Sequence, residues 1–187
     1  MSDSKKFKDW DDRYADSDYL FGTAPNDFLK SVAERLPPNS RILCLADGEG
    51  RNGVYLATLG HKVTAVDQSR VGLEKAKKLA KQKQVSIETI KADLAEYDLG
   101  VESWDCIVSI FFHIPSSVRA HIYPRIITAL KPGGILILES YTPEQLNHGT
   151  GGPPIAELML TKDELAQYFS EMNLEHLQEL EREVIEG

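Results

Sequence analysis

The sequence predicts one α/β domain, a mostly parallel sheet with helices on both faces. Three observations carry this prediction. Strand-like and helix-like segments alternate along the chain, which favours βαβ crossovers. Some strand-like runs, such as 135–138, are continuously apolar, as in strands buried on both faces. The chain of 187 residues, 42% of them hydrophobic, is long enough to bury one sizeable core.

The first half of the chain gives each element a local signal. Two helices are expected at 7–17 and 25–36, and Pro37-Pro38 ends the second. Short apolar runs bounded by turn signals predict strands at 41–45, 62–66 and 85–90. Helices at 51–59 and 69–83 are expected between them, and the second shows an apolar face at helical spacing.

The second half continues the alternation. Strands are expected at 104–110 and 135–139, separated by a helix at 116–130 that the turn 131–134 stops. Residues 142–158 form a long loop rich in Gly and Pro, a length that usually has a function. A helix is expected at 161–170, and the tail 174–185 could supply one final strand. We therefore expect residues 1–187 to be one domain, with 1–38 as a helical N-terminal lid and 39–187 as the core.

Charge and composition narrow the functional classes. A net charge of -8 and a pI near 5.1 disfavour nucleic acid and anionic membranes as partners. The lysines between 75 and 83 are expected to lie on the solvated face of a helix. Cys44 and Cys106 fall in apolar runs and predict buried free thiols, with no metal-ligand spacing. With no signal-peptide pattern at the start, a cytoplasmic location is expected.

The strongest local motif is the glycine loop at 45–53, which follows a strand and opens a helix. Its spacing, Gly48-x-Gly50-x-x-Gly53, matches the dinucleotide fingerprint, and Asp67 closes the next strand. A carboxylate there can accept hydrogen bonds from both ribose hydroxyls. The loop alone fits a nicotinamide-dependent oxidoreductase as well as other nucleotide-binding enzymes. The oxidoreductase remains an alternative, although no Tyr-x-x-x-Lys pair is present.

Later segments favour another class. Asp93 follows the third strand, where it could reach an adenine amino group, and Leu-Lys-Pro-Gly-Gly at 130–134 precedes the fifth strand. With the glycine loop and Asp67, these features resemble the class I S-adenosylmethionine-dependent methyltransferase family across nearly the whole chain. The resemblance implies a Rossmann-like, doubly wound fold and S-adenosylmethionine as cofactor. The family sheet has seven strands, so this chain is expected to lack the last one and to expose a sheet edge, which would allow a homodimer.

Within that family the sequence looks most like the tellurite-resistance and thiopurine methyltransferase-like branch. The residues that carry this likeness are Trp10, Phe21 and the segments 19–23, 50–52, 112–115 and 141–145. The likeness implies a small-molecule acceptor, and a soft thiol or chalcogen nucleophile is one option. Such an acceptor needs no dedicated base, so no catalytic residue is nominated.

The candidate site residues follow from the motifs and the resemblance. Cofactor-binding candidates are Trp10, Phe21, Ala46, Asp47, Gly48, Gly50, Arg51, Asn52, Asp67, Gln68, Ser69, Asp93, Leu94, Ser109 and His113. Substrate-side candidates are Tyr19, Glu139 and Tyr141. His113 follows the fourth strand and is also a possible base near neutral pH.

Two positions depart from the family pattern. Cys44 stands where members usually have an acid that binds the amino end of the cofactor, and Ala46 replaces the first glycine. Ala46 would be strained if the loop requires a left-handed backbone, and Asp47 could replace the missing acid. These departures motivate a further alternative, a non-catalytic protein that binds S-adenosylmethionine.

Overall fold

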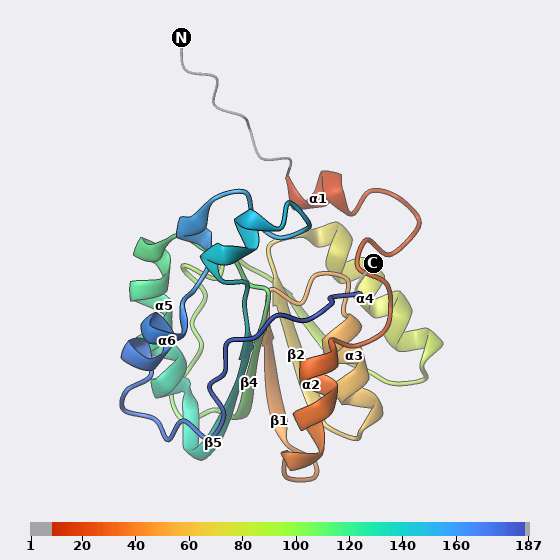
Figure 1. Ribbon diagram of the computed structural model, residues 1–187. Coiled ribbons are helices and arrows are strands. Elements are labelled where there is room, and N and C mark those ends of the chain that lie inside the picture. The colour runs from red at the N-terminus through yellow and green to blue at the C-terminus, as the bar shows by residue number, and fades with distance from the viewer. Residues whose placement is uncertain (1–8, 186–187) are drawn as a thin grey trace.

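The computed structural model describes residues 9–185 and contains a five-stranded sheet at its centre (Figure 1). The strand order is β3-β2-β1-β4-β5, and every neighbouring pair is parallel. The strands are β1 (Arg41–Leu45), β2 (Lys62–Asp67), β3 (Glu88–Lys91), β4 (Trp104–Ile110) and β5 (Leu130–Glu139). The predicted α/β fold is confirmed.

Six α-helices surround the sheet in the described part of the chain. They are α1 (Trp10–Arg13), α2 (Asp27–Val32), α3 (Arg51–Thr58), α4 (Arg70–Gln82), α5 (Ser116–Ala129) and α6 (Lys162–Tyr168). Between these elements the chain forms short 3₁₀ helices at Ala33–Arg35, Pro143–Asn147 and Ala156–Leu158. The predicted helix at 7–17 is thus much shorter than expected, and its first two residues lie outside the described part. The third strand begins later than predicted, because 85–87 lead into it without ladder bonds.

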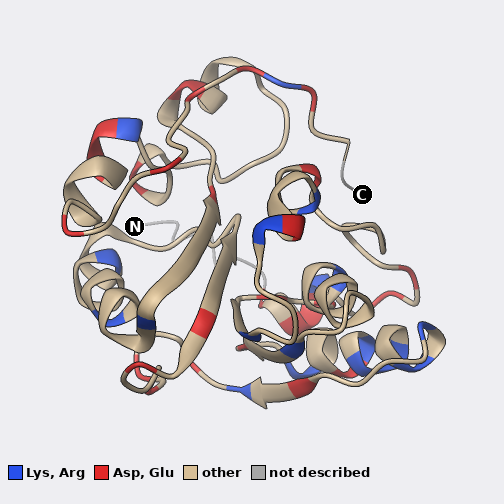
Figure 2. Cartoon of the chain, turned by 90° about the horizontal axis from the view of Figure 1, so that it is seen from below, with Lys and Arg blue, Asp and Glu red and all other residues tan. Residues whose placement is uncertain are grey.

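Helices cover both faces because strand side chains alternate between two cores. Leu43, Leu45 and Ile107 face a cluster built with α5 and α6. Ile42 and Cys44 face the opposite cluster, built with α2 and α3. Figure 1 shows these two helix layers on either side of the sheet. The charged residues of the strands lie at or next to the strand ends, which leaves the middle of each strand uncharged (Figure 2), as expected for a doubly covered sheet.

The two cysteines lie within this core, as predicted. Both are free and buried, Cys44 on β1 and Cys106 on the neighbouring β4. Burial raises the pKa of both thiols, so they stay protonated.

One lysine departs from the predicted solvated helix face. Lys75 is only 7% exposed, and its ammonium lies 2.6 Å from Glu49 Oε1. The other lysines of the 75–83 run are exposed on or just after α4. No helix in the described residues is long and apolar enough to span a membrane.

The prediction of a final strand in the tail is wrong. From 173 to 185 the described chain has no helix or strand, and it is held by side chains instead. His176 stacks on Phe28 at 5.6 Å between ring centroids, and Arg182 pairs with Glu139 at 2.7 Å. The weak apolar alternation leaves Leu174 and Leu180 exposed, so it gives no reason to pair with β5. Among residues 9–185, both of the last two family strands are therefore absent, and β5 is an edge strand.

Candidate active site

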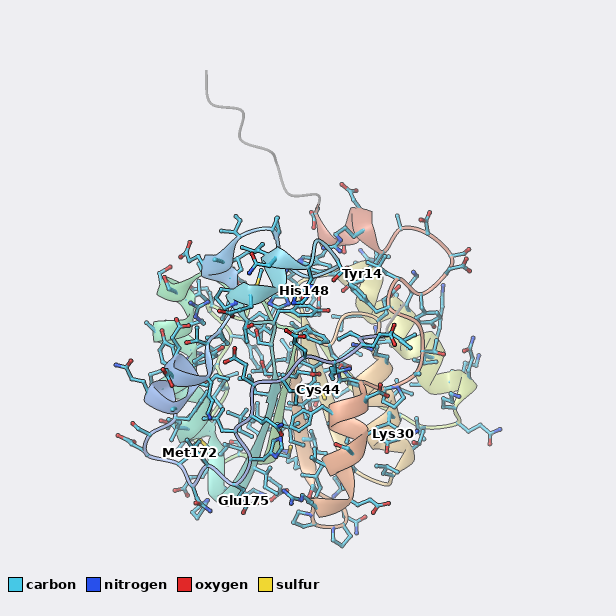
Figure 3. The ribbon with its side chains drawn as sticks, viewed as in Figure 1. Tyr14, Lys30, Cys44, His148, Met172 and Glu175 are labelled. Atoms are coloured by element: carbon cyan, nitrogen blue, oxygen red, sulfur yellow. The ribbon has the colours of Figure 1, made fainter. Side chains whose placement is uncertain are left out.

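The candidate residues gather at one edge of the sheet because the strands are parallel. The carboxyl ends of β1, β2, β4 and β5 share this edge, near the switch point where the strand order reverses between β1 and β4. Ligands of open α/β sheets bind at such a point. Figure 3 shows Tyr14 and His148 near this edge and Met172 and Glu175 far from it.

The glycine loop has a left-handed backbone at three positions. Ala46 has a φ of +51°, and Gly48 and Gly50 have φ values of +56° and +86°. The left-handed conformation that would strain Ala46 is therefore present. Both glycines are also required by packing. A Cβ at Gly48 would lie 2.6 Å from the Tyr14 hydroxyl, and one at Gly50 would lie 2.5 Å from Cβ of Ala76 on α4.

Asp47 is committed to the start of α3. Both of its carboxylate oxygens accept from the Gly53 amide at 3.2 Å. Burial raises the pKa of Asp47 to about 7, and the nearby charge of Asp67 adds to this. Its carboxylate is therefore bound to the first turn of α3. This does not favour the expectation that Asp47 replaces the acid that family members have at the position of Cys44. The Cys44 side chain itself lies in the core.

Asp67 is fixed by the loops around it. Its Oδ2 accepts from the Gly48 amide at 2.8 Å, and its Oδ1 accepts from the Ser69 amide at 2.7 Å. Only 5% of Asp67 is exposed, and this burial raises its pKa. A carboxylate has about four acceptor positions and these amides do not occupy all of them, so the side chain is oriented and can still accept from a diol.

The remaining cofactor-side candidates differ in what they can offer. Asp93 is exposed and accepts from the Ala95 amide at 2.9 Å, while Leu94 lies in the core. Ser109 is buried at the end of β4, Gln68 is exposed and Arg51 is half-buried.

Asn52 holds another part of the structure in place. Its Oδ1 accepts from the Asn26 amide at 2.9 Å, at the start of α2. This fixes the end of the N-terminal segment that crosses the edge of the sheet. The Asn52 side chain is buried, so its role is the positioning of α2.

The N-terminal segment is anchored above the glycine loop. Asp11 Oδ1 accepts from the Ser69 hydroxyl at 2.5 Å and from the Val71 amide at 3.1 Å, at the start of α4. Trp10 is half-buried and lies 5.3 Å from the Tyr14 ring. The sequence reasoning missed Asp11 and Tyr14, although Trp10 and Tyr14 are four residues apart, the spacing of one helix face.

A second anchor lies further along the same segment. The Leu20 amide donates to Glu49 Oε2 at 2.7 Å, and the Tyr19 hydroxyl donates to the Lys75 carbonyl at 3.1 Å. The buried Glu49–Lys75 pair therefore ties residues 18–20 to α4. Phe21 follows and is half-buried.

The ends of β4 and β5 carry a stack of three rings. Phe111 and Tyr141 lie 4.7 Å apart, and His113 lies 5.7 Å from Tyr141. Phe111 has a φ of +52°, a strained value for a bulky residue that no sequence pattern indicates. His113 Nδ1 lies 3.3 Å from the Leu158 carbonyl, and burial lowers the pKa of His113 to about 4. The imidazole is therefore neutral at pH 7, with Nδ1 donating.

A cavity of about 790 Å³ opens beside this stack. Phe111, Tyr141 and Glu139 line it, together with the 3₁₀ turn at 143–147 and the tail. Glu139 accepts from Asn26 Nδ2 at 2.6 Å and from the Arg182 guanidinium, so it is held from two sides. The third substrate-side candidate lies elsewhere, because Tyr19 lines a separate cavity of about 600 Å³ against α4.

Comparison with known proteins gives this edge a family. Residues 42–134, from β1 to the turn that begins β5, match the family described as "Methyltransferase domain". The chain carries a methyltransferase domain. The match covers the glycine loop and Asp67, and the class I family predicted from the sequence is confirmed at this level.

Individual relatives agree with this assignment. The uncharacterized methyltransferase YodH of Bacillus subtilis is 33% identical over 136 residues, which are 67% of this chain and 56% of that protein. The tRNA 5-carboxymethoxyuridine methyltransferase of Escherichia coli is 30% identical over 122 residues, 62% of this chain and 45% of that protein. The chain thus spans about half the length of these curated relatives.

A solved structure agrees on the fold. TehB from Haemophilus influenzae superposes with a TM-score of 0.64 at 21% identity, covering 77% of this chain and 49% of that one. At this identity the likeness supports the fold of the methyltransferase domain, and the tellurite-resistance branch remains a proposal.

Proposed function

We propose that the protein transfers a methyl group from S-adenosylmethionine to a small-molecule acceptor. The observation that carries this proposal is the position of Asp67. The residue lies within the matched methyltransferase domain, at the edge of the sheet where the strands have their carboxyl ends. The Gly48 and Ser69 amides orient its two carboxylate oxygens. A fixed carboxylate beside a glycine loop suits a ribose diol. We propose the other cofactor-side candidates as contacts around it, with two exceptions: the Leu94 side chain packs in the core, and the buried Asn52 side chain positions α2.

The charge at this edge fits the cofactor. S-adenosylmethionine carries a sulfonium and an ammonium besides its carboxylate, so its net charge is positive. Asp47 and Asp67 lie at the ends of β1 and β2, and burial raises the pKa of both. A cation that binds nearby would stabilise their ionised forms.

When bound, the cofactor supplies an activated methyl group on its sulfonium. The chain has to bind, align and exclude water. We propose residues 1–38 as the lid that covers the cofactor, since Asp11 and Glu49 hold its described part over the glycine loop. His113 is neutral at pH 7, so it would orient groups by hydrogen bonding rather than by charge.

We propose that the cavity beside Phe111 and Tyr141 receives the acceptor. Among the options, its charges favour a neutral or cationic thiol over a chalcogen oxyanion. Of the two cations in its lining, Arg182 is paired with Glu139 and Lys162 is exposed. Its exposed carboxylates are Asp27, Glu144, Glu179 and Glu181. Anions would therefore meet repulsion at the entrance.

Titration calorimetry tests the cofactor, and labelled methyl transfer tests the acceptor. We expect binding of S-adenosylmethionine and its demethylated product at micromolar to millimolar concentrations. Cysteamine and 2-mercaptoethanol should then be methylated faster than mercaptoacetate or selenite. No binding of either cofactor form at millimolar concentration contradicts the proposal.

The alternatives give different results in the same assays. Binding without turnover of any acceptor would favour the non-catalytic protein that Cys44 and Ala46 suggest. Binding of NADH without competition by S-adenosylmethionine would favour the oxidoreductase. Because the net charge is -8, we propose that no nucleic acid binds, and the transcript of the tRNA on which the E. coli relative acts is the control ligand.

The exposed edge of β5 supports a further part of the proposal, a homodimer. Ile135, Leu136 and Leu138 are only half-buried, and an open strand edge is a template for pairing. Light scattering would detect the dimer, and a monomer whose β5 amides are fully protected from hydrogen exchange would contradict it. A cytoplasmic location stays a proposal from the sequence.

A further inference from the structure

Tyr14 is placed against the glycine loop although the loop motif does not include it. The residue is 5% exposed, and its ring lies between Gly48 and Gly72. A Cβ at Gly48 would lie 2.6 Å from its hydroxyl, and one at Gly72 would lie 3.1 Å from its Cδ2. In Figure 3 the side chain lies between α1 and the loop edge of the sheet. Both glycines therefore make room for this ring.

The hydroxyl of this buried residue has no hydrogen-bond partner among residues 9–185. The tyrosine is held by ring contacts instead, with Trp10 at 5.3 Å. Among the described residues, two side-chain atoms are both fully enclosed and without a hydrogen-bond partner, His61 Nδ1 and Arg119 Nε. The Tyr14 oxygen is not one of them, so it is still accessible from outside the protein. Because this oxygen remains accessible and has no partner in the described chain, a ligand that enters here can form a hydrogen bond with it.

The surroundings suit a ligand that offers donors or positive charge. Burial raises the pKa of the Tyr14 phenol far above its usual range, and the nearby charges of Asp67, Glu49 and Asp47 raise it further. The phenol therefore stays neutral and can both donate and accept a hydrogen bond. The opposing charge from Arg13 is weaker than that of Asp67 or Glu49.

The position of Tyr14 is fixed without help from its hydroxyl. Asp11 binds the start of α4 on one side, and Leu20 binds Glu49 on the other. The ring is thus held by the anchors of the N-terminal segment. The hydroxyl is left free for a different partner.

We propose that the Tyr14 hydroxyl binds S-adenosylmethionine directly, beside the group that Asp67 holds. This inference rests on the proposed function and adds a cofactor contact from the N-terminal segment. Tyr14 is then a binding residue, and it makes the lid part of the cofactor site.

The test is calorimetric titration of the full chain and its Tyr14→Phe variant with S-adenosylmethionine and with its demethylated product. Phenylalanine keeps the ring and removes only the unpaired hydroxyl, so the thermal midpoint should stay unchanged or rise slightly. The dissociation constants for both ligands should rise roughly 3- to 10-fold, the loss expected for one hydrogen bond. Tyr55→Phe is the matched control, since it removes a phenol hydroxyl from α3, and its affinities should equal those of the unchanged chain.

Other outcomes overturn the inference. Equal affinities for Tyr14→Phe and the unchanged chain would show that the hydroxyl makes no contact. Tighter binding by Tyr14→Ala would show that the ring blocks the site instead of serving it. If the unchanged chain binds neither ligand, the proposed function fails. If the unchanged chain binds and the Tyr14→Phe variant has the same dissociation constants, only this inference is overturned.

Discussion

The two halves of the candidate site are built differently. At the ends of β1 and β2, Asp47, Asp67 and Glu49 each have internal partners, and the N-terminal segment is anchored above them. At the ends of β4 and β5, stacked rings border a cavity of about 790 Å³, and the tail that closes it has no regular structure. One half is preorganised, and the other is open.

This difference fits a division of labour. A cofactor with one fixed shape rewards a preorganised site, because little order has to be gained on binding. An acceptor site on the same scaffold can change with loops and tails that carry little of the fold. Substitutions in the first half should therefore affect stability strongly, and those in the second half should affect acceptor use.

The largest effect is expected from Lys75→Met. It leaves Glu49 buried without its partner at 2.6 Å, and breaking such a pair costs about 3–5 kcal/mol. Urea unfolding measures this loss in the free energy of unfolding. Lys77→Met is the control, because its pair with Glu74 is exposed and should contribute almost nothing. A small loss for Lys75→Met would mean that the first half is not held by this pair.

Asp67→Ala should lower the free energy of unfolding by a similar amount and should also abolish cofactor binding. It leaves the Gly48 and Ser69 amides without their acceptor, at about 1–3 kcal/mol for each buried amide that no water reaches. Asp67→Asn keeps one accepting oxygen and should recover part of the stability. Calorimetry and urea unfolding separate the two effects, and full cofactor affinity in Asp67→Ala would remove Asp67 from the site.

Asp47→Asn should stabilise the protein at alkaline pH. The folded pKa of Asp47 is about 7, above its ordinary value of 3.8, so ionisation opposes folding. The contribution of protonated Asp47 to the free energy of unfolding is complete below pH 3.8. It is lost as the pH rises through about 7. At pH 8 we expect a gain of up to about 4 kcal/mol, since the shift spans about three pKa units and each unit is worth about 1.4 kcal/mol. The gain should vanish near pH 4, and a pH-independent gain would contradict this cause.

Ala46→Gly should raise stability by about 1 kcal/mol, because glycine removes the left-handed strain at φ +51°. Ala120→Gly, on an exposed turn of α5, should instead lower it by about the same amount. Thermal unfolding of both variants compares the two signs. If both variants lose stability equally, the loop does not strain Ala46.

The smallest stability effect is expected on the open half. Arg182→Gln removes the ion pair with Glu139, which keeps its bond to Asn26, so the loss should stay below about 1 kcal/mol. The KM of the acceptor should change, and the dissociation constant of the cofactor should not. A change in cofactor affinity alone would contradict the division between the halves.

The sequence predicted the fold well because strongly periodic segments bury whole faces. The strand at 104–110 and the helix after Ser69 appear where the patterns place them. The tail was mispredicted, because weak alternation over 174–185 cannot reveal that Arg182 and His176 have side-chain partners far along the chain.

The site was predicted less completely. Motif spacing locates Gly48 and Asp67, since parallel strands bring their ends to one edge. It cannot show that Asp47 turns inward, that Phe111 takes a positive φ, or that Tyr14 fills the space above the loop. Those facts depend on the three-dimensional arrangement of the loops and, for Tyr14, on contacts between segments distant in sequence. The one local hint was the four-residue spacing of Trp10 and Tyr14.

The two buried cysteines provide a built-in probe of these ideas. Cys44 and Cys106 lie on the central strands β1 and β4, and a thiol reagent reaches them only after the sheet opens. Their rate of labelling therefore reports how often the core opens under native conditions. A ligand that binds the folded chain should slow both thiols together, so the protein carries its own reporter for the cofactor that its loop is proposed to hold.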